Sequence, residues 1–176
     1  FKDVINGLIF EGKEVVKEED LEDILPKSNL KTDTGMLTYQ ERDVSKLWKK
    51  EGVVLSLFAI ENQTKIDKEM IFRVLSYDGA SYKTQISRVD AIKKRLAKIK
   101  GKTDGANEAL RKSLIDELKT GKKIYPVITI VLYYGEKEWK SPLSLREALN
   151  IPKELSHLIP DYKVNIYNLQ NLSDSE

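Results

Sequence analysis

The segment VVLSLFAIENQ at residues 53–63 is the stretch that decides the fold. Apolar and β-branched residues fill it almost to its end, which is typical of a buried strand. A second strand-like segment, DVSKLW at residues 43–48, precedes it, and residues 49–52 (KKEG) form a short turn with glycine at its end. The two segments therefore predict an antiparallel hairpin.

Two further segments extend this hairpin into a sheet. Residues 125–135 read YPVITIVLYYG, a continuous apolar run of the kind found in strands buried on both faces. Residues 162–169 (YKVNIYNL) alternate as a last strand. The sequence thus predicts one α/β domain over residues 1–176, with a central mixed β-sheet flanked by helices.

Helical periodicity marks the segments between the strands. Residues 1–10 read as an amphipathic helix, and Thr64 or Asp67 can cap a helix that continues through Gly79. Residues 79–81 (GAS) would allow a close approach of this helix to the sheet. Two short helices are also expected, an acidic one at residues 18–25 closed by Pro26 and another at residues 144–150.

Residues 88–123 differ from the rest of the chain in charge. They contain twelve Lys and Arg against five Asp and Glu, a local charge of +7, whereas the whole chain carries only +2. Apolar residues keep helical spacing through this segment, so it predicts a basic helical hairpin inserted into the domain, with residues 102–105 at its tip.

The composition excludes several classes of site. The chain has no cysteine and one histidine, His157, expected at a helix end or on the surface, so disulfides, thiolate metal sites and Ser-His-Asp relays are excluded. Absence of cysteine suits a reducing cytoplasm. No apolar run approaches the ~20 residues of a membrane span, and the chain begins at Phe1 without a recognisable signal peptide. We expect a cytoplasmic protein without a membrane partner.

Two acids are expected to meet at one end of the hairpin. Asp43 opens its first strand and Glu61 lies near the end of its second, so antiparallel pairing predicts their carboxylates about 3–6 Å apart. Gln63, and Lys65 if the strand persists, would share the face of Glu61. Asp43 and Glu61 suit Mg²⁺ or Mn²⁺, which takes one or two carboxylates and completes its shell with water and phosphate oxygens.

Each of these residues also has an ordinary interpretation. Asp43 could be a solvated acid at a strand start, Glu61 could mark where a buried strand emerges, and Lys65 could be a solvated lysine. The same choice holds for the basic segment, which is either a solvated helical face or a surface for DNA phosphates. The residues considered for DNA binding are Arg73, Tyr77, Lys93, Lys94, Arg95 and Lys98.

Several blocks of sequence carry a family resemblance. Residues 60–70 (IENQTKIDKEM) and 73–82 (RVLSYDGASY) resemble the recombination-promoting nuclease and putative transposase family. Residues 42–44, 125–135 and 162–166 fit the same pattern, so the resemblance covers most of the chain except the basic insert. That family is similar to the PD-(D/E)XK nucleases, which implies a restriction-endonuclease-like core, cleavage of DNA linked to recombination or mobile elements, and magnesium dependence.

The resemblance also assigns roles. Asp43 matches the first acid and Glu61 the second, while Gln63 stands where these nucleases usually have lysine. Because glutamine cannot supply charge, the resemblance implies either that Lys65 or Lys46 takes the electrostatic role, or that the amide positions water. Asp3 is a candidate for a further acid on the first helix.

Other functions remain open. The missing lysine favours a nuclease-fold module that binds DNA or protein without cleavage. A three-carboxylate transposase of the ribonuclease H type would need a third acid downstream, for which Asp161 is available. The sequence does not fix the oligomeric state, and a homodimer is one option.

Overall fold

A five-stranded mixed sheet forms the centre of the protein. The computed structural model describes residues 1–24, 27–31, 37–99, 105–120 and 124–172. In the sheet order β1-β4-β5-β6-β7, the first two pairings are antiparallel and the last two are parallel. The strands are β1 (Leu21–Asp23), β4 (Val44–Lys50), β5 (Val53–Gln63), β6 (Val127–Tyr133) and β7 (Asn165–Asn168).

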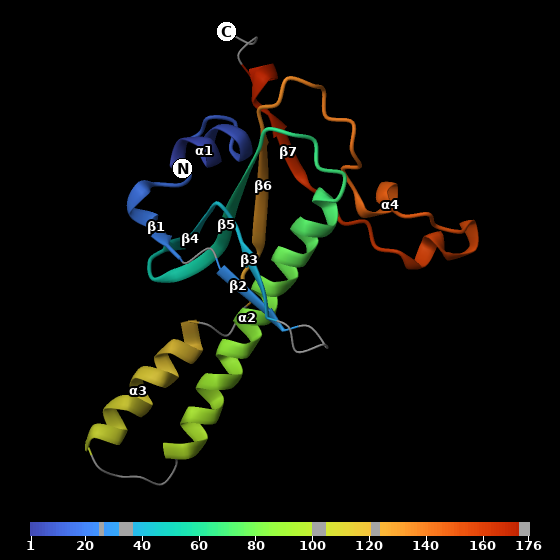
Figure 1. The fold of residues 1–176 in the computed structure, drawn as a ribbon. Coiled ribbons are helices and arrows are strands. Elements are labelled where there is room, and N and C mark those ends of the chain that lie inside the picture. Colours follow the sequence, from blue (N-terminus) through green and yellow to red (C-terminus); the bar gives the residue numbers. More distant parts are fainter. Residues whose placement is uncertain (25–26, 32–36, 100–104, 121–123, 173–176) are drawn as a thin grey trace.

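Helices and a small second sheet surround this centre (Figure 1). The α-helices are α1 (Lys2–Ile9), α2 (Met70–Ile99), α3 (Gly105–Thr120) and α4 (Leu145–Ala148), and the 3₁₀ segments are η1 (Glu18–Asp20), η2 (Lys153–Leu158) and η3 (Leu169–Leu172). The second sheet is an antiparallel pair, β2 (Lys27–Lys31) and β3 (Leu37–Glu41), with β2 lying against α2. Among the described residues, no helix has the length and apolar character of a membrane span.

The two faces of the sheet are covered by different helices. Phe58, Ile60 and Ile130 pack with Ile5 of α1, whereas Ala59 and Val131 face the side that α2 covers. This division follows from the alternation of side chains along a strand. It confirms the prediction of a central sheet with helices on both sides, and it places Glu61, which has the parity of Ala59, beneath α2.

Most predicted elements are present, and the 18–25 segment is the exception. The β4–β5 hairpin, the buried β6 strand and the predicted helices at residues 1–10 and 144–150 are confirmed, as α1 and α4. The last strand is limited to residues 165–168. The acidic helix at residues 18–25 is wrong, because η1 is followed by β1, which pairs with the outer edge of β4. Backbone pairing with an open sheet edge outweighs local helical preference here. Pro26 lies outside the described residues.

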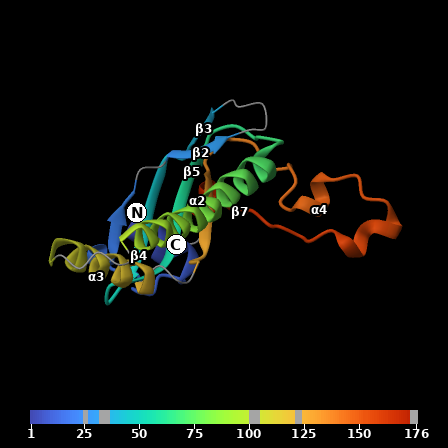
Figure 2. The ribbon, with the colours of Figure 1, turned by 90° about the horizontal axis from the view of Figure 1, so that it is seen from below.

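The basic segment forms an arm that projects beyond the sheet (Figures 1 and 2). Its first half is the continuation of α2, which runs unbroken from residue 70 to residue 99, and α3 forms the second half. Arg88 of α2 donates hydrogen bonds to Glu117 of α3 at 2.8 and 3.0 Å, so the two helices are joined at the base of the arm. Residues 102–104 of the predicted tip lie outside the described residues.

The glycine that needs close approach is Gly135, not Gly79. A Cβ at Gly79 would meet nothing within 4 Å, so this glycine is not the residue of the 79–81 segment that a close approach requires. The other two residues of the segment, Ala80 and Ser81, are buried, so the packed side of α2 at this point runs through them. A Cβ at Gly135 would lie 2.4 Å from the carbonyl oxygen of Thr64 and 2.4 Å from the hydroxyl of Tyr133.

These two glycines give a matched pair of substitutions. Gly135→Ala should lower the free energy of unfolding by about 1–3 kcal/mol, because backbone and a buried side chain must shift to admit the methyl group. Gly79→Ala should raise it by about 0.5–1 kcal/mol, since alanine is the better helix former and has open space. Thermal unfolding measures both. Equal effects of the two substitutions would contradict the close approach at Gly135.

Candidate functional site

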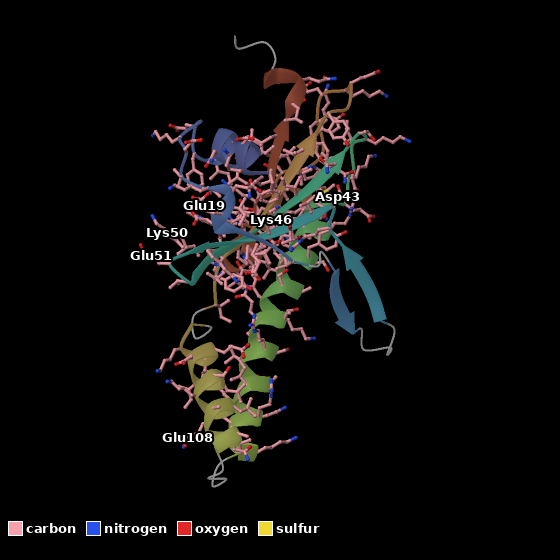
Figure 3. All side chains as sticks on the ribbon, turned by 90° about the vertical axis from the view of Figure 1, so that its left-hand side faces the viewer. Glu19, Asp43, Lys46, Lys50, Glu51 and Glu108 are labelled. Atoms are coloured by element: carbon pink, nitrogen blue, oxygen red, sulfur yellow. The ribbon has the colours of Figure 1, made fainter. Side chains whose placement is uncertain are left out.

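Asp43 and Glu61 lie at the same end of the β4–β5 hairpin. Val44 pairs with Ile60, so Asp43, the residue before β4, stands opposite Glu61 in the register. Figure 3 labels Asp43 near this end of the sheet. β5 continues through Gln63 alongside the parallel strand β6, so this is also the carboxyl end of two parallel strands. Such ends are common places for binding sites in open α/β sheets.

Asp43 is exposed and held by the next strand. Its Oδ2 accepts hydrogen bonds from the backbone N–H of Asn62 at 2.7 Å and from the Asn62 side-chain amide at 3.1 Å. These bonds tie the start of β4 to the end of β5, and they fix the carboxylate beside the residue that follows Glu61.

Glu61 is a buried carboxylate that lacks a full set of partners. Only 2% of the residue is exposed, and Oε1 has no hydrogen-bond partner among the described residues. Oε2 accepts one long contact, 3.4 Å, from Arg73. Burial, reinforced by repulsion from Asp43, raises the pKa of Glu61 to about 7, against the attraction of Arg73 and Arg42. An acid held in this state gains from a cation.

Asp78 of α2 organises the polar interior next to Glu61. Its Oδ1 accepts a hydrogen bond from Arg42 at 2.8 Å and one from the Thr129 hydroxyl at 2.6 Å, and its Oδ2 accepts one from the Tyr162 hydroxyl. Arg42 also donates to the Ser81 hydroxyl at 3.0 Å. Burial raises the pKa of Asp78 and lowers that of Arg42, while the ion pair between them opposes both shifts.

Arg73 closes the site toward solvent. It donates to Asp67 at 2.8 Å, contacts Glu61, and lies 5.9 Å from the ring centre of Tyr77. Its side chain is 38% exposed, whereas that of Glu61 is 3% exposed. Arg73 is therefore the solvent-exposed partner of this contact, and Glu61 is the buried one.

The charges of the cluster leave room for one divalent cation. Two guanidinium groups, Arg42 and Arg73, face four carboxylates, so the fully ionised cluster carries a net charge of −2. The four carboxylates belong to Asp43, Glu61, Asp67 and Asp78. Arg42 is committed to Asp78 and Arg73 to Asp67, which leaves Asp43 and Glu61 as the acids with capacity for a metal.

Two carboxylates suit an ion such as Mg²⁺ or Mn²⁺, which keeps water ligands, better than a metal ion whose ligands all come from the protein. Within the described residues, no group of three or more His, Cys, Asp and Glu side chains is placed to hold one ion. Mg²⁺ accepts such a site, because it commonly takes one or two carboxylates and fills the other positions with water and phosphate oxygens. Whether Asp43 and Glu61 share one ion stays a prediction.

The structure separates the two lysines considered as replacements for the usual one. Gln63 is the last residue of β5 and shares the face of Glu61, but the strand ends before Lys65, which is exposed in the following loop. Lys46 pairs with Phe58, on the sheet face that α1 covers, and contacts Glu18 and Asp23. The proposal that Lys46 takes the electrostatic role of the usual lysine is wrong, because Lys46 and Glu61 lie on opposite faces of the sheet. Figure 3 labels Lys46.

The other sequence candidates lie apart from the acids. Asp3 is exposed on α1, across the sheet from Glu61, and Asp161 is exposed and accepts from the backbone of Arg146 at 3.3 Å. His157 is exposed in η2, as expected.

The residues considered for DNA binding differ in exposure. Tyr77 is buried between Arg42 and Arg73, and the four basic residues of the arm are exposed on α2: Lys93, Lys94, Arg95 and Lys98. A role of these residues in DNA binding stays a prediction.

Four residues of the site were missed by the sequence reasoning: Arg42, Asp78, Thr129 and Tyr162. Arg73, Tyr77 and Ser81 recur every four residues on α2 and put polar groups on one helix face, but this row includes none of the four missed residues. The pairing of Asp78 with Arg42 and Tyr162 joins residues far apart in the chain, and no local pattern indicates it.

Comparison with known proteins supports the family resemblance over part of the chain. The family model described as putative transposase, YhgA-like, matches residues 109–176, which hold most of α3, together with β6, α4 and β7. The comparisons with curated proteins and with solved structures found no match. Thr129 and Tyr162 lie inside the matched stretch, whereas Asp43 and Glu61 lie outside it. The choice of Asp43 and Glu61 as candidate site residues therefore depends on their geometry and not on the family match.

The raised pKa of Glu61 predicts a pH-dependent stability. Its protonated form stabilises the metal-free protein fully below the ordinary pKa of 4.5, and this contribution is lost as the pH rises through about 7. Glu61→Gln mimics the protonated side chain. As the pH rises from 4.5 to 8, its free energy of unfolding should therefore increase relative to that of the wild type by up to about 3 kcal/mol. Urea unfolding at both pH values measures the change.

The exposed residue Glu154 supplies the control for this measurement. Glu154→Gln makes the same chemical change at a surface position, outside the Glu61 site, and should leave the pH dependence of unfolding unchanged. A Glu61→Gln protein whose stability follows pH as the wild type does would show that Glu61 is not held in a destabilised ionised state.

Proposed function

We propose that this protein is a metal-dependent DNA endonuclease that hydrolyses phosphodiester bonds. The observation that carries the proposal is the buried Glu61 carboxylate, with one oxygen unpartnered, opposite Asp43 at the carboxyl end of two parallel strands. Its pKa of about 7 and the net charge of −2 around it favour a divalent cation.

The residues present have defined tasks in such a reaction. Asp43 and Glu61 would hold Mg²⁺ or Mn²⁺. Such an ion would lower the pKa of a water molecule and offset charge on the phosphate. The amide of Gln63, next on the same strand face, would orient that water. Arg73 leaves Glu61 when substrate enters and contacts a phosphate oxygen, which its partly exposed guanidinium can reach.

The arrangement of the core supports a PD-(D/E)XK type of site. The resemblance implied an Asp on one hairpin strand and a Glu-x-Lys on the next; Asp43 stands directly before β4, and Glu61 lies on β5 beneath α2. The family match over residues 109–176 supports a role in mobile elements or recombination. Gln63, in place of lysine, is the departure from that pattern, and it leaves the positive charge of the site to the metal and Arg73.

The geometry of α2 links the arm to the acids. At a rise of 1.5 Å per residue, Lys94 lies about 30 Å along the helix from Arg73, which equals about nine base pairs of DNA. At about 100° per residue, Lys94, Arg95 and Lys98 project within about 60° of the direction of Arg73. Lys93 projects to nearly the opposite side and pairs with Asp90 at 3.8 Å, so the proposed DNA face omits this lysine, although the sequence had suggested it. One face of α2 can thus follow a duplex over most of a helical turn.

Glu61→Gln tests the chemistry. The substitution keeps the shape of the side chain and removes the charge that a cation needs, so cleavage of plasmid or oligonucleotide DNA with Mg²⁺ or Mn²⁺ should fall at least ~100-fold while metal-free DNA binding persists. Gln63→Lys is the companion. It should retain or raise activity if the amide only orients water, and lower it if the amide binds the metal.

A wild-type protein that binds DNA tightly but cuts no DNA form with either metal would overturn the nuclease proposal. The specific observation that favours this second function, a non-cleaving DNA-binding module, is the contact of Arg73 with one oxygen of Glu61, because an arginine at that oxygen competes with a metal ion.

The arm predicts a salt-dependent contribution to the binding of duplex DNA. The triple substitution Lys94→Ala, Arg95→Ala and Lys98→Ala should weaken binding of a duplex of about 20 base pairs and reduce the slope of log affinity against log salt by up to about 2.7. Lys93→Ala should change that slope little, because this lysine faces away. Fluorescence anisotropy at several salt concentrations measures both. An unchanged slope in the triple variant would assign this face of the arm to solvent or to a protein.

A further inference from the structure

A cavity of about 630 Å³ lies where β5 and β6 end, lined by residues 64–66 and 133–137. Both strands run toward it in parallel, and it begins directly after Gln63, two residues beyond Glu61. A molecule whose reacting phosphate reached Glu61 would therefore have its neighbouring nucleotide at this cavity.

The walls of the cavity are fixed by specific contacts. The backbone N–H of Tyr134 donates to the carbonyl oxygen of Gln63 at 3.0 Å, and the Tyr133 hydroxyl donates to the carbonyl oxygen of Lys137 at 2.6 Å. Gly135 packs so closely on Thr64 that no side chain fits there. The two loops are thus held together, and the cavity is a formed feature of the strand ends.

The charge of the cavity favours an anion. Lys65 and Lys137 are exposed on its two walls, and neither forms an ion pair within the part of the chain that the structure describes. Glu136 is the acid among the lining residues, so the lining carries a net charge of +1. Two unpaired ammonium groups on facing loops suit the phosphates that flank a nucleotide.

Tyr134 gives the cavity an aromatic surface. Although large and apolar, its side chain is 44% exposed, whereas its neighbour Tyr133 is 1% exposed and serves the core. An exposed ring beside cations is the combination by which proteins hold unpaired nucleotides, because every base has a face on which an aromatic ring can stack. Bases inside a duplex are already stacked on one another, so only an unpaired base offers that face.

We propose that this strand-end cavity binds an unpaired nucleotide next to the scissile phosphate, with Tyr134 stacked on its base and Lys65 and Lys137 on its phosphates. The proposal rests on the nuclease function and deepens it by naming the substrate class. The preferred substrate is DNA with an unpaired segment at the cut, such as a single strand, a flap or a branch.

Binding without metal tests the cavity separately from cleavage. The probes are a fluorescent 12-nucleotide oligothymidine and a spacer strand of the same length that has the sugar and phosphate but no bases. Tyr134→Ala should weaken binding of oligothymidine about tenfold or more and leave the spacer strand unaffected. Tyr134→Phe, which keeps the ring, should bind oligothymidine like the wild type. The double substitution Lys65→Ala and Lys137→Ala should weaken both probes.

Lys153→Ala, at an exposed lysine of η2, is the control and should change neither affinity. Equal binding of oligothymidine by the wild type and Tyr134→Ala would overturn the cavity proposal, even if the protein cleaves DNA. Loss through Tyr134 in a protein that cuts no DNA would keep the cavity as a nucleotide site and overturn the nuclease function. Far-ultraviolet circular dichroism of each variant separates lost binding from lost folding.

Discussion

The rest of the site depends on the carboxylate of Asp78, because its hydrogen bonds join four parts of the chain. It receives Arg42 from the start of the hairpin, Thr129 from β6 and Tyr162 from the segment before β7, all on one side chain of α2. A buried ion pair costs desolvation, and hydrogen bonds to its remaining atoms offset that cost. Because Arg42 precedes Asp43 in the chain, the same bonds hold the end of the hairpin against α2 and so position both candidate ligands.

Glu61 differs from Asp78 in how its burial is compensated. Asp78 has a partner for both oxygens, whereas Glu61 has one long contact and one oxygen without a partner among the described residues. Two neighbouring buried acids thus differ in their hydrogen bonding: Asp78 joins several elements, whereas Glu61 keeps one oxygen for which we propose a ligand. Titratable groups perturbed in this way cluster at functional sites. Arg73 stabilises the ligand-free state, since its guanidinium lies over the carboxylate from the solvent side.

Sequence patterns predicted the parts of this site that depend on local periodicity. The β-branched run of β5 and its turn gave the hairpin, and the register then brought Asp43 opposite Glu61. The end of β5 was harder to predict, because it is set by a contact between Thr64 and Gly135, which lie far apart in the sequence. Lys65 follows this end, so it lies in a loop and not on the strand face that carries Glu61. β1 was missed since it exists only through its pairing with β4. The Asp78 network was missed because its partners come together only in the folded chain.

The most direct test of the account is a crystal structure of the wild-type protein grown with Mn²⁺ at pH 8, where anomalous scattering locates the ion. At this pH Glu61 is largely ionised, since its pKa is about 7. The account predicts one Mn²⁺ in direct contact with carboxylate oxygens of both Asp43 and Glu61, with Arg73 turned away from Glu61 toward solvent. An intact contact between Arg73 and Glu61, with no anomalous peak beside either acid at saturating Mn²⁺, would contradict it.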